Sequence, residues 1–303
     1  MNLDQNELKD KFGKNIFFNE NLSKYSWFNL GGPAKIFFKP ESVNQLIDFF
    51  KYANGSSKII CLGAGSNTLI RDGGFSGIII KLSPKFSYIK RVGENVLEVG
   101  AGTLDKTLSM FAAENSIINF EFLSCIPGSV GGAIKMNSGC YGDEISKILI
   151  SIKTIDFKGN VREIKKDEIE FFYRGTNLPE DLIILSAKLQ GKIGDKNLIN
   201  KKIKKYNKEK KKTQPSQIKT CGSTFKNPKD KKAWKLIKNS DCDLASFGEA
   251  KISEKHCNFF VNEGGASSAD IEKLIEFVRS KVFERHKINL DLEIKIIGEN
   301  SKK

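Results

Sequence analysis

Histidine is scarce in this chain, and its cysteines are scattered. The sequence has 303 residues, with two histidines and six cysteines, at positions 61, 125, 140, 221, 242 and 257. None of the cysteines forms a CxxC pair. Zinc sites and disulfide scaffolds draw on closely spaced Cys and His residues. We therefore expect no metal site and no disulfide framework, but the reduced thiols of a cytoplasmic protein.

Long apolar segments are also missing. The first fifteen residues, MNLDQNELKDKFGKN, are polar and of mixed charge, so no secretory signal is expected. No apolar run approaches the roughly 20 residues that a membrane span needs. Basic stretches interleaved with aromatic residues are absent, as are helix-turn-helix and zinc-finger patterns. The sequence thus predicts a cytoplasmic protein with no membrane span and no nucleic-acid partner.

Positive charge is in excess. Fifty Lys and Arg residues outnumber 36 Asp and Glu residues, for a net charge of +14. Such a charge could attract nucleic acid, an anionic membrane or a small anionic ligand. It could also reflect the codon bias of an AT-rich genome, because Lys, Ile, Asn and Phe are all abundant. We favour codon bias combined with a small anionic ligand.

Glycine gathers in residues 124–142, SCIPGSVGGAIKMNSGCYG. Glycine accepts positive φ and lets a ligand approach the backbone. Alone, such a cluster is more typical of tight turns between strands. It would also suit main chain that lies against a flat or anionic ligand.

A second glycine turn follows a buried-type strand at residues 59–62. Its sequence is Gly63-Ala64-Gly65-Ser66-Asn67, and its backbone N–H groups could form a nest for phosphate oxygens. The alternative is an ordinary turn. It is not a dinucleotide-binding fingerprint, because Thr68 stands where the third glycine should come.

Periodicity and capping patterns place several helices. Ser42 and Gln45 have the spacing of a capping box before a helix that ends near residue 54, and Ser267 and Asp270 repeat that spacing before a helix to about residue 282. Thr103 is expected to cap a helix over 104–112. Residues 195–212 predict a lysine-rich helix, and 171–174 the end of a short helical piece.

Strand patterns are clearest in two places. Residues 147–157 and 161–164 predict a hairpin that turns at Lys158-Gly159-Asn160. Residues 288–296 alternate strictly between apolar and polar, which directs Glu293 away from the core, toward solvent or a cleft. The pattern as a whole suggests three domains, at 1–82, 83–194 and 195–303.

Eight stretches in this order resemble the UDP-N-acetylenolpyruvoylglucosamine reductase (MurB) family. They are YSWFNLGGPA, LGAGSN, IPGSVGGAIKMNSGCYG, FYRGT, TQPS, GSTFKNP, SEKHCNFFVN and LEIKIIG, and they cover about residues 25–298. The chain is most similar to the shorter branch, which lacks a tyrosine-bearing insertion. The resemblance implies an α+β fold: a two-domain FAD-binding platform of the vanillyl-alcohol-oxidase type, with a C-terminal α+β substrate-binding domain.

The resemblance also implies the chemistry. NADPH reduces bound FAD, and hydride then passes to UDP-N-acetylglucosamine enolpyruvate, giving UDP-N-acetylmuramate for peptidoglycan synthesis. In this family pattern Ser223 matches the proton donor, Arg174 the group that holds the developing negative charge, and Glu293 the glutamate of the last strand. Individually they could instead be a turn cap, a surface ion-pair residue and an exposed strand residue.

The resemblance places the ligands as well. For FAD it implies Gly63, Ala64, Gly65, Ser66 and Asn67 on the pyrophosphate, and Pro127, Gly128, Ser129, Gly131, Gly132 and Ile134 under the flavin ring, where Ser129 could donate a hydrogen bond. For the nucleotide-sugar substrate it implies Gln214, Lys226, Asn227, Lys255 and His256. No metal is implied, and we expect a monomer.

Three residues depart from the family pattern. Cys125 replaces a glycine before the Ile-Pro-Gly turn, Thr176 replaces a serine, and Cys221 replaces an alanine beside Gly222-Ser223. We expect Cys221 to make the site sensitive to thiol reagents. Two alternatives stay open: another FAD oxidoreductase acting on a different sugar or alcohol, and a basic nucleic-acid-binding protein that has lost its flavin.

Overall fold

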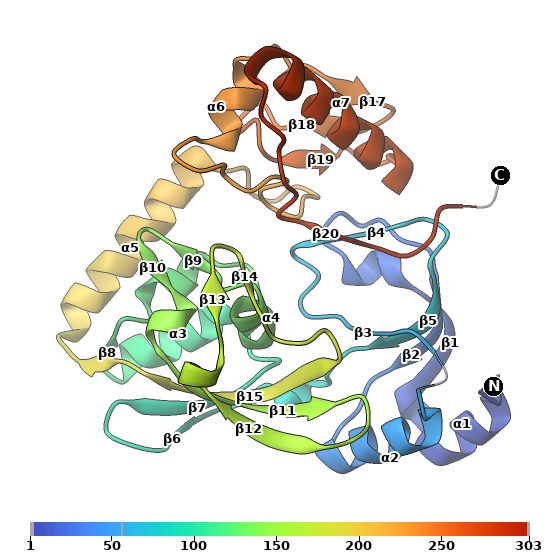
Figure 1. The fold of residues 1–303 in the computed structure, drawn as a ribbon. Helices are drawn as coiled ribbons and strands as arrows, with labels where there is room; N and C mark the ends of the chain where they lie inside the picture. Colours follow the sequence, from blue (N-terminus) through green and yellow to red (C-terminus); the bar gives the residue numbers. More distant parts are fainter. Residues whose placement is uncertain (1–2, 56, 302–303) are drawn as a thin grey trace. The chain divides into compact units, whose positions relative to one another are not determined.

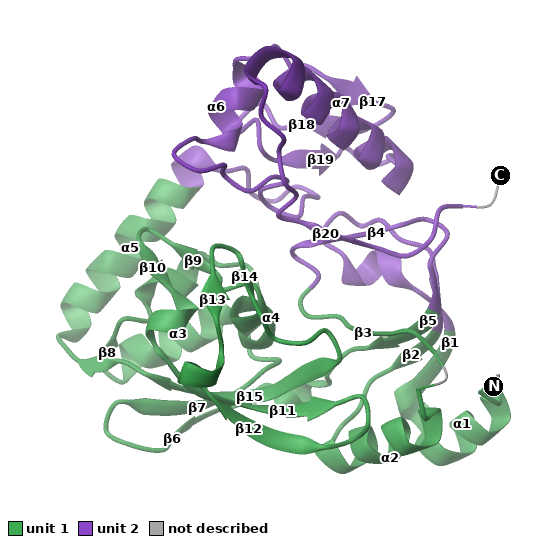
Figure 2. Cartoon of the chain, in the orientation of Figure 1, with its two compact units in different colours: residues 1–18, 36–64, 77–210 green, residues 19–35, 65–76, 211–303 purple. Residues whose placement is uncertain are grey.

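Two compact units make up the chain, and each is assembled from separate stretches of sequence. The computed structural model describes residues 3–55 and 57–301. Unit 1 comprises Met1–Phe18, Ile36–Ala64 and Gly77–Lys210, and unit 2 comprises Asn19–Lys35, Gly65–Ser76 and Lys211–Lys303 (Figure 2). Within the described residues, no helix is both long and apolar enough to cross a membrane.

The secondary structure is a mixture of helices and many short strands (Figure 1). The α-helices are α1 (Gln5–Phe12), α2 (Val43–Ala53), α3 (Asp105–Glu114), α4 (Val130–Lys135), α5 (Lys196–Thr213), α6 (Ala233–Lys238) and α7 (Ser268–His286). The strands are β1 (Ile16–Asn21), β2 (Pro33–Phe38), β3 (Ile59–Cys61), β4 (Thr68–Ile70), β5 (Phe75–Ile80), β6 (Ile89–Arg91), β7 (Val96–Gly100), β8 (Ile117–Ile118), β9 (Gly139–Cys140), β10 (Asp143–Glu144), β11 (Leu149–Asp156), β12 (Val161–Lys165), β13 (Phe171–Phe172), β14 (Gly175–Thr176), β15 (Leu182–Gln190), β16 (Lys192–Ile193), β17 (Ser246–Phe247), β18 (Ala250–Ile252), β19 (Phe260–Asn262) and β20 (Lys295–Ile297). A short 3-10 helix, η4 (Glu121–Cys125), precedes α4.

A five-stranded antiparallel sheet is the centre of unit 1. Its order is β12-β11-β15-β7-β6 (Figure 1). The predicted β11–β12 hairpin is confirmed, with Ile155 opposite Val161. The Asp156 carboxylate closes its turn by accepting hydrogen bonds from the backbone N–H groups of Lys158 (2.9 Å) and Asn160 (2.8 Å). One face of this sheet is covered by α3 and α4, whose apolar residues share its buried core.

A second sheet has the order β1-β2-β5-β3. The hydrophobic core beside this sheet is rich in phenylalanine. The rings of Phe38 and Phe49 stack with centroids 4.3 Å apart. The predicted capping box of α2 forms only in part. Ser42 accepts from the Gln45 N–H at 3.2 Å, but the Gln45 side chain accepts from the Glu41 N–H instead of that of Ser42.

Two local predictions in unit 1 are wrong. Thr103 does not cap α3, because its hydroxyl donates to the Tyr88 carbonyl (3.1 Å) and the N-cap position falls on Leu104. Residues 171–174 are not helical. Strands β13 and β14 pair Phe172 with Gly175, so Tyr173 and Arg174 form a tight hairpin turn.

Unit 2 contains a small sheet, the helices α6 and α7, and a parallel strand pair. The sheet order is β17-β18-β19, and β4 pairs with β20. The predicted capping box of α7 is complete: Ser267 Oγ accepts from the Asp270 N–H (3.1 Å), and the Asp270 carboxylate accepts from the Ser267 N–H (3.0 Å). The predicted apolar face of α7 is buried in the unit 2 core.

The C-terminal strand is shorter than predicted. Only Lys295–Ile297 form strand β20, yet the alternation holds further upstream, since Leu290 and Ile294 are buried. This upstream stretch is tied to the chain near Ser223 by an isolated bridge between Phe225 and Leu292.

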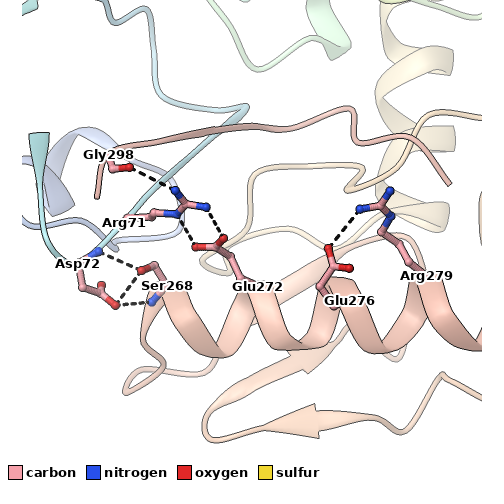
Figure 3. A network of polar contacts seen from close by, with 7 residues as sticks. All are labelled: Arg71, Asp72, Ser268, Glu272, Glu276, Arg279 and Gly298. Carbon is pink, nitrogen blue, oxygen red and sulfur yellow. Dashed lines mark hydrogen bonds and ion pairs between the residues drawn. The ribbon is translucent and has the colours of Figure 1, made fainter. Parts of the chain in front are cut away.

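The turn after β4 is fastened to the start of α7 by charged hydrogen bonds (Figure 3). Arg71 donates from Nε to Glu272 Oε1 (2.8 Å) and from Nη2 to Oε2 (2.7 Å). The Asp72 carboxylate accepts from the N–H (2.7 Å) and the hydroxyl (2.8 Å) of Ser268. The Glu272 partner raises the pKa of Arg71. Such two-point pairing fixes orientation as well as distance.

We expect Glu272→Gln to lower the free energy of unfolding by about 1–2 kcal/mol, because it removes a charge-assisted bidentate pair that is only partly exposed. Glu276→Gln is the matched control. Glu276 pairs with Arg279 along the exposed surface of the same helix (Figure 3), so its loss should cost under about 0.5 kcal/mol. Urea unfolding curves measure both changes. Equal losses would contradict the importance of the Arg71 pair.

Candidate active site

The turn at residues 63–67 requires glycine. Gly65 has φ +70°, and a Cβ there would lie 1.8 Å from the Tyr25 carbonyl oxygen. That oxygen leaves no room for any side chain, so no other residue fits. Gly63 accepts a hydrogen bond from Lys81 Nζ (2.6 Å) through its carbonyl. Ala64, Ser66 and Asn67 are half-buried, which leaves them partly accessible to a ligand.

The glycine cluster is joined to residues 101–105 by backbone hydrogen bonds. The N–H groups of Val130 and Gly131 donate to the carbonyls of Thr103 and Ala101, each at 2.9 Å. The Asp105 N–H donates to the Gly128 carbonyl at 3.1 Å. The start of α4 is thereby fixed to the segment between β7 and α3.

The glycine cluster presents its main chain at the surface. Pro127 and Gly132 are exposed, and Gly128 and Gly131 are half-buried. Among the predicted cofactor residues, Gly65, Ser129 and Ile134 are buried. The side chain of Ile134 lies in the unit 1 core, on the inner side of α4.

The two predicted FAD segments meet within unit 1. A Cβ on Gly63 would lie 3.2 Å from Ser129 Oγ, and one on Gly132 would lie 3.6 Å from the same atom. The lack of side chains at Gly63 and Gly132 lets their main chain come close to the buried Ser129 side chain. Glycine main chain beside a hydroxyl group suits the close approach of a flat cofactor such as the flavin of FAD.

Asp105 is a buried acid that sequence reasoning missed. Its side chain is completely buried, and neither carboxyl oxygen has a hydrogen-bond partner among the described residues. Its Oδ2 lies 2.7 Å from where a Cβ of Gly128 would be. Burial raises the pKa of Asp105 well above its usual value. An aspartate at the start of a helix is normally exposed, and its negative charge interacts favourably with the helix dipole, so the sequence carried no signal of a carboxyl with a raised pKa here.

Arg174 occupies a strained turn beside the glycine cluster. Its φ is +58°, a left-handed conformation that costs non-glycine residues of order 1–3 kcal/mol. Its Nη2 donates to the Gly139 carbonyl at 3.2 Å, and its guanidinium lies 5.0 Å from the centre of the Tyr173 ring. The hairpin turn therefore holds a half-buried cation against the end of the cluster.

Ser223 lies in an extended segment held on both sides. The Thr224 N–H donates to the Asn258 carbonyl, and the Thr224 carbonyl accepts from the Glu293 N–H, both at 2.8 Å. The Asn258 side chain also bonds both backbone groups of Phe225, at 3.0 and 2.8 Å. Ser223 itself is half-buried and bridges to Phe259.

Glu293 is tied to the end of the glycine turn. Asn67 Nδ2 donates to the Glu293 carbonyl (3.0 Å), and the Lys295 N–H donates to the Asn67 carbonyl (2.9 Å). Glu293 is half-buried. Unit 2 thus brings together three residues that are far apart in sequence. They are Asn67, Glu293 and Thr224, which directly follows Ser223.

The predicted substrate residues differ from one another in burial and in hydrogen-bond partners. Lys226 follows directly on the Ser223 segment and is half-buried, whereas the Asn227 side chain accepts from the Ala233 N–H at the start of α6 (3.0 Å). Lys255 Nζ donates to the Lys211 carbonyl (2.6 Å). His256 accepts from the Asn258 N–H (3.2 Å), and burial lowers its pKa. Gln214 is half-buried just after α5.

Cys221 does not have the features of a reactive thiol, contrary to expectation. It is buried and donates to the carbonyls of Thr68 (3.3 Å) and Gly65 (3.6 Å). Burial raises its pKa to about 11. The thiol is therefore protonated and shielded, and the expected sensitivity to thiol reagents is not supported at this position.

We expect Asp105→Asn to stabilise the protein at alkaline pH. The folded chain keeps the Asp105 proton where the unfolded chain has lost it, so stability falls as pH rises from about 4 toward the raised pKa. Asparagine cannot ionise, so the free energy of unfolding of the variant should exceed that of the unaltered chain by about 1–3 kcal/mol at pH 8. This difference should shrink toward pH 4. Asp48→Asn, at an exposed position on α2, should give no such slope. Urea unfolding across pH measures this; an advantage independent of pH would contradict it.

Comparison with known proteins places this geometry in a family. Residues 34–165 match a family described as FAD binding domain, and residues 214–297 match the C-terminal domain of UDP-N-acetylenolpyruvoylglucosamine reductase.

Whole-chain similarities agree. The chain is 48% identical to the UDP-N-acetylenolpyruvoylglucosamine reductase of Pelagibacter ubique, over 96% of both chains, and 45% identical to that of Rickettsia akari, over 92% of this chain and 94% of the other. The crystal structure of the Thermus caldophilus enzyme superposes with a TM-score of 0.82 at 30% identity, covering 93% of this chain and 98% of that one. The chain therefore belongs to the UDP-N-acetylenolpyruvoylglucosamine reductase (MurB) family.

Proposed function

We propose that this chain reduces UDP-N-acetylglucosamine enolpyruvate to UDP-N-acetylmuramate with NADPH, a reaction at a CH–CH group that supplies peptidoglycan synthesis and so serves cell-wall growth, shape and division. Family membership and the matched FAD-binding domain support the activity. When bound, FAD would supply hydride, taken from NADPH, to the terminal carbon of the enol ether. A different sugar or alcohol substrate is not favoured, because the C-terminal reductase domain matches as well.

The residues of unit 1 fit the flavin. Gly63 and Ala64 begin the turn that would hold the pyrophosphate, continued in sequence by Gly65, Ser66 and Asn67. Gly128, Gly131 and Gly132 would let the ring approach the main chain, and the Ser129 hydroxyl would donate to it. The close approach of Gly63 to Ser129 is the observation that supports this assignment.

Ser223 is proposed as the proton donor. A serine hydroxyl is a weak acid, so it can serve only where the accepting carbon is strongly basic or the proton is resupplied. The hydrogen bonds on either side of Thr224 support this role, since they fix the position of the adjacent Ser223 backbone. A general acid typically contributes about 10²–10⁴-fold in rate.

Arg174 and Glu293 are proposed to manage the negative charge that develops on the enolate. A guanidinium hydrogen bond that strengthens in the transition state is worth roughly 1.5–3 kcal/mol. The strained turn and the Gly139 contact support a functional reason for the position of Arg174. A carboxylate at Glu293 would repel the enolate, so it would act protonated or by orienting a water.

Lys226 is the strongest candidate for the substrate diphosphate, because it continues the Ser223 segment. Asn227, Lys255 and His256 already have backbone partners, so their contribution would need those contacts to change. Gln214 is a further candidate. We further propose that the enzyme acts in the cytoplasm as a monomer. We also propose that it has three domains, at residues 1–82, 83–194 and 195–303.

Ser223→Ala tests the proposed acid. Reduction of the flavin by NADPH should change by less than about 2-fold, whereas reoxidation by the enolpyruvyl substrate should slow about 10²–10⁴-fold. Stopped-flow absorbance separates the two steps. Ser280→Ala, at an exposed position on α7, should alter neither. An equal loss in both steps would contradict the role of Ser223 as acid.

A further inference from the structure

An aromatic cluster in unit 2 extends from the Ser223 segment to helix α6. Phe259 forms an isolated bridge with Ser223, and its ring centroid lies 4.8 Å from that of His256. The His256 ring lies 6.3 Å from the Trp234 ring and is tilted by 57° against it. Trp234 is the second residue of α6. Two ring contacts therefore connect the segment of the proposed proton donor to this tryptophan.

Trp234 differs from its neighbours on α6 in its exposure. Ala233, Leu236 and Ile237 are buried in the unit 2 core, whereas Trp234 is 38% exposed. Burying an indole ring on folding is favourable, so a tryptophan at the surface stabilises the fold less than its size allows. Exposed tryptophan is instead typical of surfaces that bind a partner. The exposed part of this ring is available to a flat ligand.

The chain around Trp234 is strongly basic. Residues 226–238 contain six lysines and a single acidic residue, Asp230. The nearest lysine in sequence, Lys235, places its Nζ 5.6 Å from the centre of the Trp234 ring. Cations next to an aromatic ring suit a nucleotide, because the cations pair with its phosphates and the ring stacks on its base. The surface therefore has the chemistry of a nucleotide-binding site.

A local hydrogen bond joins the Lys226 segment to the start of α6. The Asn227 side chain accepts from the Ala233 N–H at 3.0 Å. The Lys226 N–H donates to the Asp291 carbonyl at 2.8 Å, which fixes the same segment from its other side. Trp234 directly follows Ala233. The proposed diphosphate residue and the exposed ring are thus held by one set of contacts within unit 2.

We propose that the Trp234 ring stacks on the uracil base of the nucleotide-sugar substrate and so contributes to the affinity for uridine nucleotides. The identity of this ligand rests on the proposed function. A substrate with its reacting carbon at Ser223 and its diphosphate at Lys226 would extend toward α6, where the ring would meet the base. The adenine base of NADPH is the competing occupant, because an aromatic face accepts any base.

Tryptophan fluorescence tests the contact directly, because the chain has only two tryptophans. Trp27→Phe leaves Trp234 as the single source of tryptophan emission. In this variant, loaded with FAD, UDP should change the emission to a saturating value, at a lower concentration than ADP requires. Emission that UDP leaves unchanged overturns the proposal. An equal or tighter response to ADP overturns the assignment to uracil.

Calorimetric titration with UDP measures what the ring contributes. Trp234→Ala should raise the UDP dissociation constant about 5–150-fold, the effect of losing one base stack. Trp234→Phe keeps an aromatic face and should raise it by less than about 5-fold. Phe283→Ala is the matched control and should leave it unchanged. Phe283 is also an exposed aromatic residue on a helix, with Lys287 Nζ 5.8 Å from its ring centre.

The outcomes for Trp234 and for the proposed function are distinguishable, because UDP binding needs no turnover. A Trp234→Ala chain that binds UDP as tightly as the unaltered chain overturns the proposal, and so does a loss in Trp234→Phe equal to that in Trp234→Ala. The fluorescence experiment keeps Trp234 and does not depend on the folding of these variants. An unaltered chain that binds UDP at Trp234 but transfers no hydride to the enolpyruvyl substrate would instead contradict the proposed function.

Discussion

The backbone hydrogen bonds at Thr224 are the constraint on which the proposed catalytic residues of unit 2 depend. They join three stretches of chain, near residues 224, 258 and 293, and the side chain of Asn67 adds the glycine turn to the same set. Ser223 and Glu293 owe their positions to these bonds rather than to neighbours in sequence. The role proposed for Ser223 needs such fixation, because small displacements of a proton donor reduce rates strongly.

Much of the fold could be predicted from the sequence where local chemistry decides it. The Ser267–Asp270 capping box and the hairpin at residues 158–160 are confirmed, because each rests on a few adjacent residues. The glycine at position 65 has a clear physical reason in the Tyr25 carbonyl. The motif order was specific enough to identify the family, which the relatives confirm.

The remaining features depend on tertiary structure that no local pattern encodes. The pKa of Asp105 is raised because the fold buries it beneath Gly128, and the Cys140 thiol donates to the Phe122 carbonyl because β9 returns to η4. Arg174 follows an aromatic run that resembles a helix end, yet strand pairing places it in a turn. Ile134 has the glycine cluster as its neighbour, but the inward side of α4 carries it into the core. The discontinuous units likewise arise from contacts between distant segments.

The absorbance of the purified protein tests the central claim most directly. The protein should be yellow, NADPH should bleach its flavin band under anaerobic conditions, and UDP-N-acetylglucosamine enolpyruvate should restore the band in amounts equal to the flavin reduced. A colourless protein that FAD cannot reconstitute, or a bleached band that this substrate fails to restore, would contradict the account.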